Sequence, residues 1–121
     1  MAARRKDPVD QLSAICLAFP EVVNKPFGGH SAPAFRVNDK IFVHTSEDST
    51  SFACKAPAGV QAALVASDPE RFFVPAYVGS KGWVGVRLDV EQDWDEMAEL
   101  AEDSYRMTAP KRLVKRLDGE P

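Results

Sequence analysis

Few residues of this 121-residue chain could carry out a reaction, and they do not cluster in the sequence. The histidines are His30, in a glycine-rich loop, and His44, which we expect at a strand end. Nucleophilic catalysis needs a nucleophile within reach of a base, and neither histidine has the local context of such a pair. Cys16 and Cys54 each lie in an apolar pattern without a second ligand at metal-binding spacing, which predicts two buried thiols. We therefore predict a protein that is not an enzyme and that holds no metal and no cofactor.

Two glycine-rich stretches have a superficial likeness to phosphate-binding loops. They are residues 28–30 and residues 79–82, Gly-Ser-Lys-Gly. Neither completes the pattern of glycines, lysine and hydroxyl residue that opens a helix around a nucleotide phosphate. We interpret both as turns.

Charge is distributed unevenly along the chain. The formal net charge is −3, which argues against a protein that coats nucleic acid non-specifically. Eight of the 18 acidic residues lie between positions 89 and 103, where there is no Lys or Arg. The rest of the chain therefore has an excess of positive charge, and one face could be basic on a molecule that is acidic overall.

Basic side chains are the strongest remaining chemical signal. They border two predicted hairpins and line a predicted C-terminal helix, so they could contact the phosphate backbone of DNA if the hairpins project from one side. The alternative is that these charges only keep exposed strands from pairing edge to edge. The candidate DNA-binding residues are Arg36, Lys40, Lys55, Lys81, Arg87, Lys111 and Arg112.

The elements that would position these residues follow from hydrophobic periodicity and turn residues. Asp7 and Pro8 predict a helix start, and Pro20 its end. Residues 21–27 predict a short edge strand, and residues 35–43 a hairpin that turns at Asn38-Asp39, with Phe35 facing Phe42 and Arg36 opposite Ile41. A third strand is expected at residues 51–55, and a helix from Pro57 to about residue 66.

In the second half of the chain, residues 76–89 predict a hairpin of two apolar runs around the Gly-Ser-Lys-Gly turn. We expect Trp83 to anchor the core beside this turn and Lys81 to reach water. A capping box of residues 93–96 predicts a helix with an apolar face and an acidic outer face, and a last basic helix is expected from Lys111 to Leu117.

This order predicts an α+β fold, an antiparallel meander sheet with helices packed on one face. We expect a basic N-terminal tail at residues 1–7 and a single domain at residues 8–118. No apolar run approaches the roughly 20 residues of a membrane span, and no signal-peptide core is evident. We therefore expect a cytoplasmic monomer that does not bind membranes.

Several segments together resemble the MmcQ/YjbR-like proteins, over about residues 9–117. The resemblance is carried by Phe27-Gly28, Pro33-Ala34-Phe35-Arg36-Val37, Lys40-Ile41-Phe42, Tyr77-Val78-Gly79, Gly82-Trp83-Val84, Ser104-Tyr105-Arg106 and Ala109-Pro110-Lys111-Arg112-Leu113. It implies a bacterial cytosolic protein without cofactor, with a frataxin-like fold described as a double-wing DNA-binding motif. It also implies that Arg36, Lys40, Lys81, Lys111 and Arg112 occupy basic positions of the family. Frataxins carry an acidic ridge on and after their first helix, whereas the first helix of this chain has only Asp7 and Asp10 and the acidic cluster lies on a later helix, so we do not expect iron delivery.

A second hypothesis from a different functional class is a binding domain for a small molecule, a peptide or a protein. In this hypothesis aromatic side chains converge on a groove. The alternative is that these residues are ordinary core. The two hypotheses differ in the exposure they predict, since a groove requires Tyr77 and Trp83 to be accessible around a concavity. The candidate groove residues are Phe27, His30, Phe35, Tyr77 and Trp83.

Overall fold

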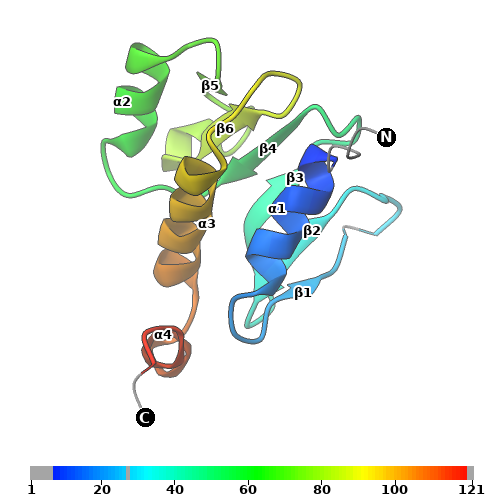
Figure 1. Ribbon diagram of the computed structural model, residues 1–121, viewed down its shortest axis with the longest axis vertical. Helices are drawn as coiled ribbons and strands as arrows, with labels where there is room; N and C mark the ends of the chain where they lie inside the picture. Colours follow the sequence, from blue (N-terminus) through cyan, green and yellow to red (C-terminus); the bar gives the residue numbers. More distant parts are fainter. Residues whose placement is uncertain (1–6, 27, 120–121) are drawn as a thin grey trace, which may run out of the picture.

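The computed structural model describes residues 7–26 and 28–119, and it is the α+β fold predicted from the sequence (Figure 1). Its six strands form one antiparallel sheet in the order β1-β2-β3-β4-β6-β5. The helices are α1 (Pro8–Leu17), α2 (Val60–Ser67), α3 (Trp94–Thr108) and α4 (Lys111–Leu117), with a 3-10 turn η1 (Gly79–Lys81). The strands are β1 (Val23–Asn24), β2 (Ala34–Val37), β3 (Lys40–Thr45), β4 (Ser51–Cys54), β5 (Phe72–Phe73) and β6 (Val84–Arg87).

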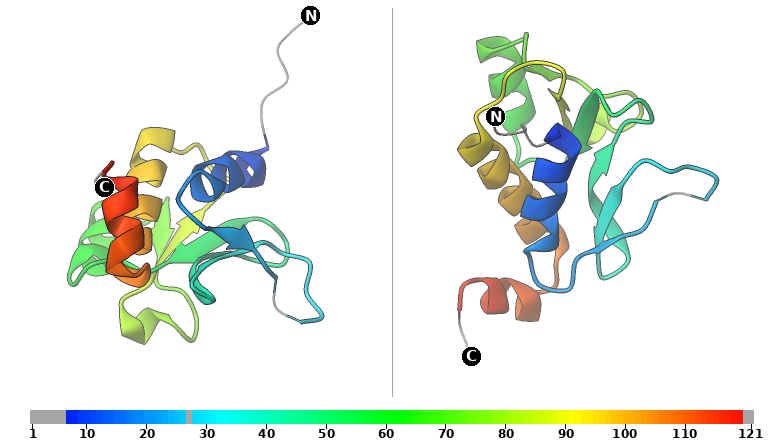
Figure 2. Two further views of the ribbon diagram at one scale, coloured as in Figure 1. Left: turned by 90° about the horizontal axis from the view of Figure 1, so that it is seen from below. Right: turned by 45° about the vertical axis from the view of Figure 1, so that its right-hand side comes forward.

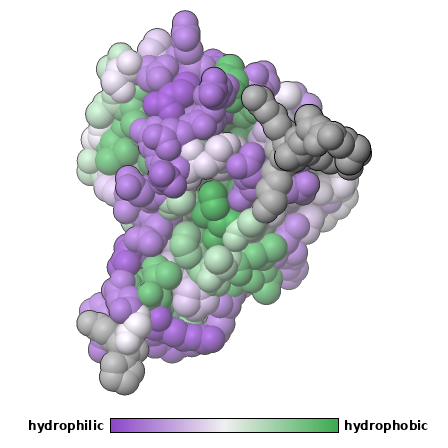
Figure 3. All heavy atoms as spheres, viewed as in Figure 1, coloured by the Kyte–Doolittle hydropathy of each residue, from purple (hydrophilic) through white to green (hydrophobic). Residues whose placement is uncertain are grey.

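Helices α1 and α3 cover one face of the sheet (Figure 2). Asp7 caps α1 by accepting a hydrogen bond from the Val9 amide, as predicted, and Asp93 caps α3 through the amides of Asp95 and Glu96. The apolar face of α3 is buried, and Figure 3, which views this side of the molecule, shows hydrophilic residues over its outer face. The side predicted to be acidic is thus the solvent side of α3.

The hairpin of β2 and β3 turns where the sequence predicted. Asn38 and Asp39 both adopt the left-handed backbone conformation, with φ of 52° and 63°, that a two-residue turn of this kind requires. Arg36 pairs with Ile41 as expected, but Phe35 pairs with Val43 and not with Phe42. The expected Phe35–Phe42 pairing is wrong because Phe42 is the extra residue of a β-bulge.

The bulge has a direct effect on the core. Because side chains alternate along a regular strand, consecutive residues normally point to opposite faces. A bulge breaks this alternation, and both Phe42 and Val43 are fully buried. Phe42 packs against Phe19 and Tyr105 on the helix side, with ring centroids 6.2 and 5.6 Å away. The hydroxyl of Ser104 on α3 donates to the carbonyl of Phe42 at 2.6 Å.

The predicted hairpin at residues 76–89 is only half correct. Its second strand exists as β6, but β6 pairs with β5, Phe72–Phe73, and not with residues 76–78. The intervening segment cannot continue a strand, because Tyr77 has a φ of 66° and Gly82 a φ of 86°. Residues 74–83, which we call the 74–83 loop, instead protrude from the side of the sheet opposite α1 and α3 (Figure 2, left, yellow-green).

Three shorter predictions also need correction. The expected strand at residues 21–27 is reduced to β1, Val23–Asn24, which does lie at the sheet edge. The helix expected from Pro57 begins at Val60, because residues 57–60 form a turn in which the Val60 amide donates to Pro57 O and Gly59 is left-handed. In the predicted capping box the Glu96 carboxylate contacts Arg71 instead.

Candidate ligand pocket

Among the described residues, no helix covers the second face of the sheet as α1 and α3 cover the first, and we call this second face the outer face. Strand register places His44, Ala53, Gly85 and Phe73 side by side across four neighbouring strands. On each strand at least one neighbour of these residues belongs to the helix-side core (Val43, Cys54, Phe72 and Val86), so alternation directs the four residues outward. The outer face is therefore built from small and aromatic residues.

A cavity of about 610 Å³ lies between this outer face and the 74–83 loop, and we call it the outer pocket. Its walls are almost entirely apolar, and its floor is the sheet itself. A site of this volume and composition is typical of those that bind small molecules, which span roughly 300–1,000 Å³. It is lined by Ile41, His44, Ser46, Ser51, Phe52, Ala53, Phe73, Pro75, Ala76, Tyr77, Val78 and Trp83.

Helix α2 is hydrogen-bonded to the middle and to the C-terminal end of the loop that closes this pocket. The side-chain amide of Gln61 donates to Gly79 O at 2.7 Å and to Trp83 O at 2.6 Å. Both acceptors belong to the loop or to its junction with β6. The site of a Cβ on Gly79 would be 2.5 Å from Val74 Cγ1, so the loop also packs closely on itself. The loop is thus a built feature with its own tertiary contacts.

Phe73 forms one wall of the outer pocket because Gly85 leaves room for it. A Cβ atom on Gly85 would lie 2.5 Å from Cζ of Phe73, a distance that real contacts do not allow. The Phe73 ring therefore lies directly on the backbone of β6. The guanidinium carbon of Arg87 is 5.0 Å from the centroid of the same ring, in cation–π geometry.

The structure brings together two of the predicted groove residues and separates two others. Trp83 is 9% exposed and Tyr77 is 98% exposed, and both line the outer pocket. Phe35 is fully buried in the helix-side core, so it does not belong to the groove. His30 lines a neighbouring recess, where its Nδ1 lies 2.8 Å from Glu47 Oε1. The prediction for Phe27 lies outside the described residues.

Most of this pocket could not be found by reading the sequence in order. Its lining comes from β3, β4, β5 and the 74–83 loop, which only the sheet topology places together. The available signals were the small residues Ala53 and Gly85 within otherwise bulky strands. Glycine in a strand often marks a close approach of another group, and here that group is Phe73.

The polar groups of the outer pocket are few. The Ser46 hydroxyl donates to Asp48 Oδ1 at 2.8 Å and accepts from the Ser51 amide at 3.1 Å. Asp48 also accepts hydrogen bonds from Thr50, and these donors hold the pKa of its carboxyl below its usual value. Ser46 and Asp48 are therefore committed to the turn between β3 and β4.

The predicted DNA-binding residues do not share one flat surface. Lys40, Lys55 and Lys81 lie at the same end of the sheet, where β3 begins, β4 ends and the chain enters β6. Arg87 lies at the opposite end of β6, opposite Ser51. The remaining candidates, in the β2–β3 hairpin and in α4, lie at other positions. Arg36 Nε donates to Lys25 O, Arg112 Nη1 lies 3.1 Å from Glu21 Oε2, and Lys111 is exposed at the start of α4.

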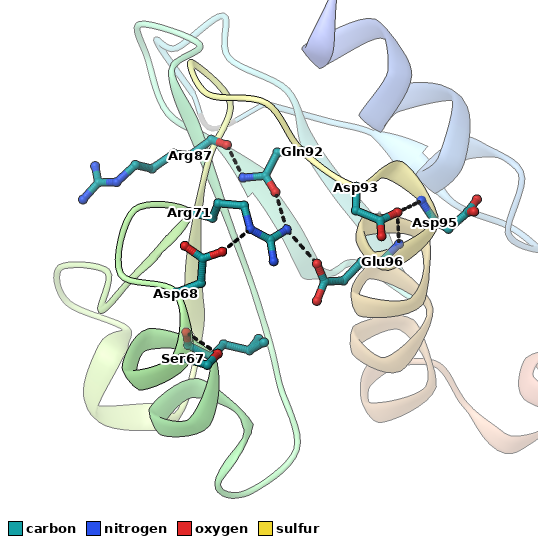
Figure 4. A network of polar contacts seen from close by, with 9 residues as sticks. Ser67, Asp68, Arg71, Arg87, Gln92, Asp93, Asp95 and Glu96 are labelled. Carbon is teal, nitrogen blue, oxygen red and sulfur yellow. Dashed lines mark hydrogen bonds and ion pairs between the residues drawn. The ribbon is translucent and has the colours of Figure 1, made fainter.

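An ion-pair network ties the strand that carries Phe73 to α3 (Figure 4). Arg71 Nε donates to Asp68 Oδ2 at 2.6 Å, and its Nη1 donates to Glu96 Oε1 at 2.7 Å and to Gln92 Oε1 at 3.2 Å. The hydrogen bond from Arg71 lowers the pKa of Asp68 below its usual value. The network thus links the segment before β5 to the segment after β6.

Chemistry other than ligand binding has little support within residues 7–26 and 28–119. No group of three or more potential metal ligands converges there. Cys16 and Cys54 are both buried, as predicted, and burial raises the pKa of the Cys54 thiol to about 12 and that of Cys16 as well. None of the helices described is long and apolar enough to cross a membrane.

The fold and the pocket define a small α+β protein whose antiparallel sheet is covered by helices on one face and hollowed on the other. The chain belongs to the YjbR family, whose model matches residues 17–107, and this confirms the resemblance seen in the sequence. A Deinococcus radiodurans protein, DR2400, with a domain described as DUF419, is similar in structure, with a TM-score of 0.76 and 22% sequence identity. The match covers 93% of this chain and 88% of that one, and at this identity it shows the fold alone. A search of curated proteins finds none that matches this sequence.

Proposed function

We propose that this protein binds a small, planar and largely apolar molecule in the outer pocket. The observation that carries the proposal is the apolar cavity of about 610 Å³, which is walled by Phe73, Tyr77 and Trp83 and floored by the sheet. Planar molecules suit such a site because aromatic side chains contact flat rings over a large area. Of the two aromatic residues that the groove hypothesis required to be accessible, Tyr77 is exposed, whereas Trp83 lines the pocket from a buried position.

The backbone at Tyr77 gives further support. A solvent-exposed aromatic side chain contributes little hydrophobic stabilisation. A left-handed backbone conformation costs free energy at a residue other than glycine. Tyr77 combines both, with 98% exposure and a φ of 66°. Residues in strained backbone conformations cluster at functional sites, where the surrounding structure holds them in place. We infer that the Tyr77 ring gains its packing partner when the pocket is occupied.

We further infer that the site binds and does not catalyse. The hydroxyl of Ser46 both donates to Asp48 and supports the Ser51 amide, so it is not poised as a nucleophile. Apart from His44, the remaining lining residues carry no group that transfers protons at neutral pH. These side chains are suited to recognise and bind a ligand.

A titration of ¹⁵N-labelled protein with 2-naphthol, a neutral planar probe, tests this proposal. We expect amide shifts that concentrate at His44, Ala53 and residues 76–83. Ala53→Leu fills the floor of the pocket from the outer face without entering the helix-side core, and it should abolish these shifts. The matched control is Val23→Ala, which shortens an exposed side chain on the edge strand β1 that does not line the pocket. Shifts elsewhere, or unchanged binding by Ala53→Leu, would contradict the proposal.

DNA binding is a second candidate, supported by the position of Lys40, Lys55 and Lys81 at one end of the sheet. Phosphate contacts of this kind give modest affinity that falls steeply with salt. Fluorescence anisotropy with a random DNA duplex at two salt concentrations should show that dependence, and Lys40→Glu with Lys81→Glu should abolish binding while the melting temperature stays nearly constant. Undiminished binding by the double variant, or no binding at low salt, would remove this candidate.

A further inference from the structure

We propose that the ligand of the outer pocket carries an anionic group, a carboxylate or a phosphate, that Arg87 binds at the pocket rim. This inference rests on the proposed function and specifies the chemical class of its ligand. It follows from three properties of Arg87: its position beside the pocket, the absence of a carboxylate partner for it among the described residues, and the ring that supports it.

Strand register places Arg87 at the pocket. It is the last residue of β6 and pairs with Ser51, which lines the pocket. Gly85 lies on the outer face, and a residue two positions further along a strand points to the same face. Figure 4 shows the Arg87 side chain extending away from α3 and from the network of Arg71. Its backbone is fixed at the same time, because Gln92 Nε2 donates to Arg87 O at 2.7 Å.

Arg87 differs from the other arginines of the described chain in its electrostatic surroundings. Each of the others has a carboxylate oxygen within 4.0 Å: Arg36, Arg71, Arg106, Arg112 and Arg116. No such ion pair is formed by Arg87 within residues 7–26 and 28–119. Asp48, which belongs to the turn beside the pocket, accepts its hydrogen bonds within that turn. A ligand anion would therefore meet an uncompensated guanidinium.

The Phe73 ring prepares this guanidinium for binding. Its centroid lies 5.0 Å from Arg87 Cζ, so the cation rests on a side chain that is itself a wall of the pocket. Contact with an aromatic ring restrains the plane of the guanidinium and leaves its N–H groups available. Two N–H groups of an arginine match the two oxygens of a carboxylate or phosphate. A ligand with a flat apolar body and one anionic end would fill both subsites.

Three probes that share one ring system separate the outcomes: 2-naphthol, 2-naphthoate and 2-naphthyl phosphate. Each is titrated at neutral pH into the wild-type protein, into Arg87→Gln and into Lys55→Gln, which removes a cation from the opposite end of β4. We expect at least one of the two anions to bind about fivefold or more tightly than 2-naphthol, at the same pocket amides. Which anion is preferred identifies a carboxylate or a phosphate as the head group.

Arg87→Gln should remove the preference for the anion over 2-naphthol, and Lys55→Gln should keep this preference. Equal affinities of all three probes for the wild-type pocket would overturn the role of Arg87 but leave the proposed function intact. A preference that persists in Arg87→Gln would likewise overturn the role of Arg87 alone. Failure of every probe to shift the pocket amides would overturn the proposed function together with this inference.

Discussion

At the scale of single residues, the missing side chain of Gly85 determines the shape of the outer pocket. The Phe73 ring occupies the space where a Cβ would lie, 2.5 Å from Cζ. Gly85→Ala must therefore displace the ring. We expect it to lower the free energy of unfolding by about 2 kcal/mol, within the range found for overpacked sites. Urea denaturation followed by circular dichroism measures this change.

A double-mutant cycle shows whether the ring is the cause. In the Phe73→Ala background the space is empty, so adding Gly85→Ala should cost less than about 0.5 kcal/mol, because the two positions are directly coupled. Equal costs in both backgrounds would mean that the glycine serves the backbone of β6 and not the aromatic wall.

At the scale of secondary-structure elements, α2 is the support of the 74–83 loop. Gln61→Glu keeps the size of the side chain but removes the two donors that reach Gly79 O and Trp83 O. Two lost hydrogen bonds of about 1 kcal/mol each should weaken the local stability of the loop. We expect hydrogen exchange at the Gly82 amide, which donates to Gly79 O, to accelerate by roughly tenfold or more.

Gln92→Glu is the matched control for this experiment. It removes a similar bond, from Gln92 Nε2 to Arg87 O at 2.7 Å, at the other end of β6. Exchange at Gly82 should stay unchanged in this variant. An equal acceleration in both variants would show a general loss of sheet stability, and α2 would then have no specific role in holding the loop.

Comparison of the observed elements with those predicted shows which structural features depend only on the local sequence. The turn at Asn38-Asp39 was predicted correctly because both residues tolerate positive φ, a property of the residues themselves. The partner of β6 was missed because Phe72–Phe73 is a two-residue strand separated from β6 by the whole 74–83 loop. Short strands are defined mainly by pairing, which periodicity in one segment does not reveal.

The β-bulge and the pocket were missed for the same physical reason. The run Ile41-Phe42-Val43 breaks the alternation expected of a half-buried strand, yet only the partner residue Phe35 shows that Phe42 is the extra residue. The pocket likewise depends on which strands are neighbours in space. Trp83 could be placed at a buried position from its size, but its role in the lining depends on a floor made by β3 and β4.

At the scale of the whole molecule, stability should depend on acid pH in a defined direction. Arginine partners hold the pKa of Glu21, Asp68 and Asp118 below their usual values in the folded protein. The folded state therefore binds fewer protons than the unfolded state as pH falls through the usual range of carboxyl pKa values. This contribution to stability is present above about pH 5 and should be lost progressively below it.

Thermal melts between pH 7 and pH 3 measure this dependence. Asp118→Asn removes one of these carboxyls, so it should lower the melting temperature more at pH 7 than at pH 3. The control Asp10→Asn changes an acidic residue of α1 that forms no ion pair within the described chain. A melting temperature that is constant across this range, or that rises on acidification, would contradict the assignment of these ion pairs.

The alternation of side chains along β3, β4 and β6 has a practical consequence for protein engineering. Ala53 and Cys54 are adjacent in the chain, yet one belongs to the pocket floor and the other to the core. A combinatorial library restricted to His44, Ala53 and Phe73 would therefore vary the outer face while the helix-side core stays unchanged. The same scaffold could then be selected for new ligands without a parallel search for compensating core mutations.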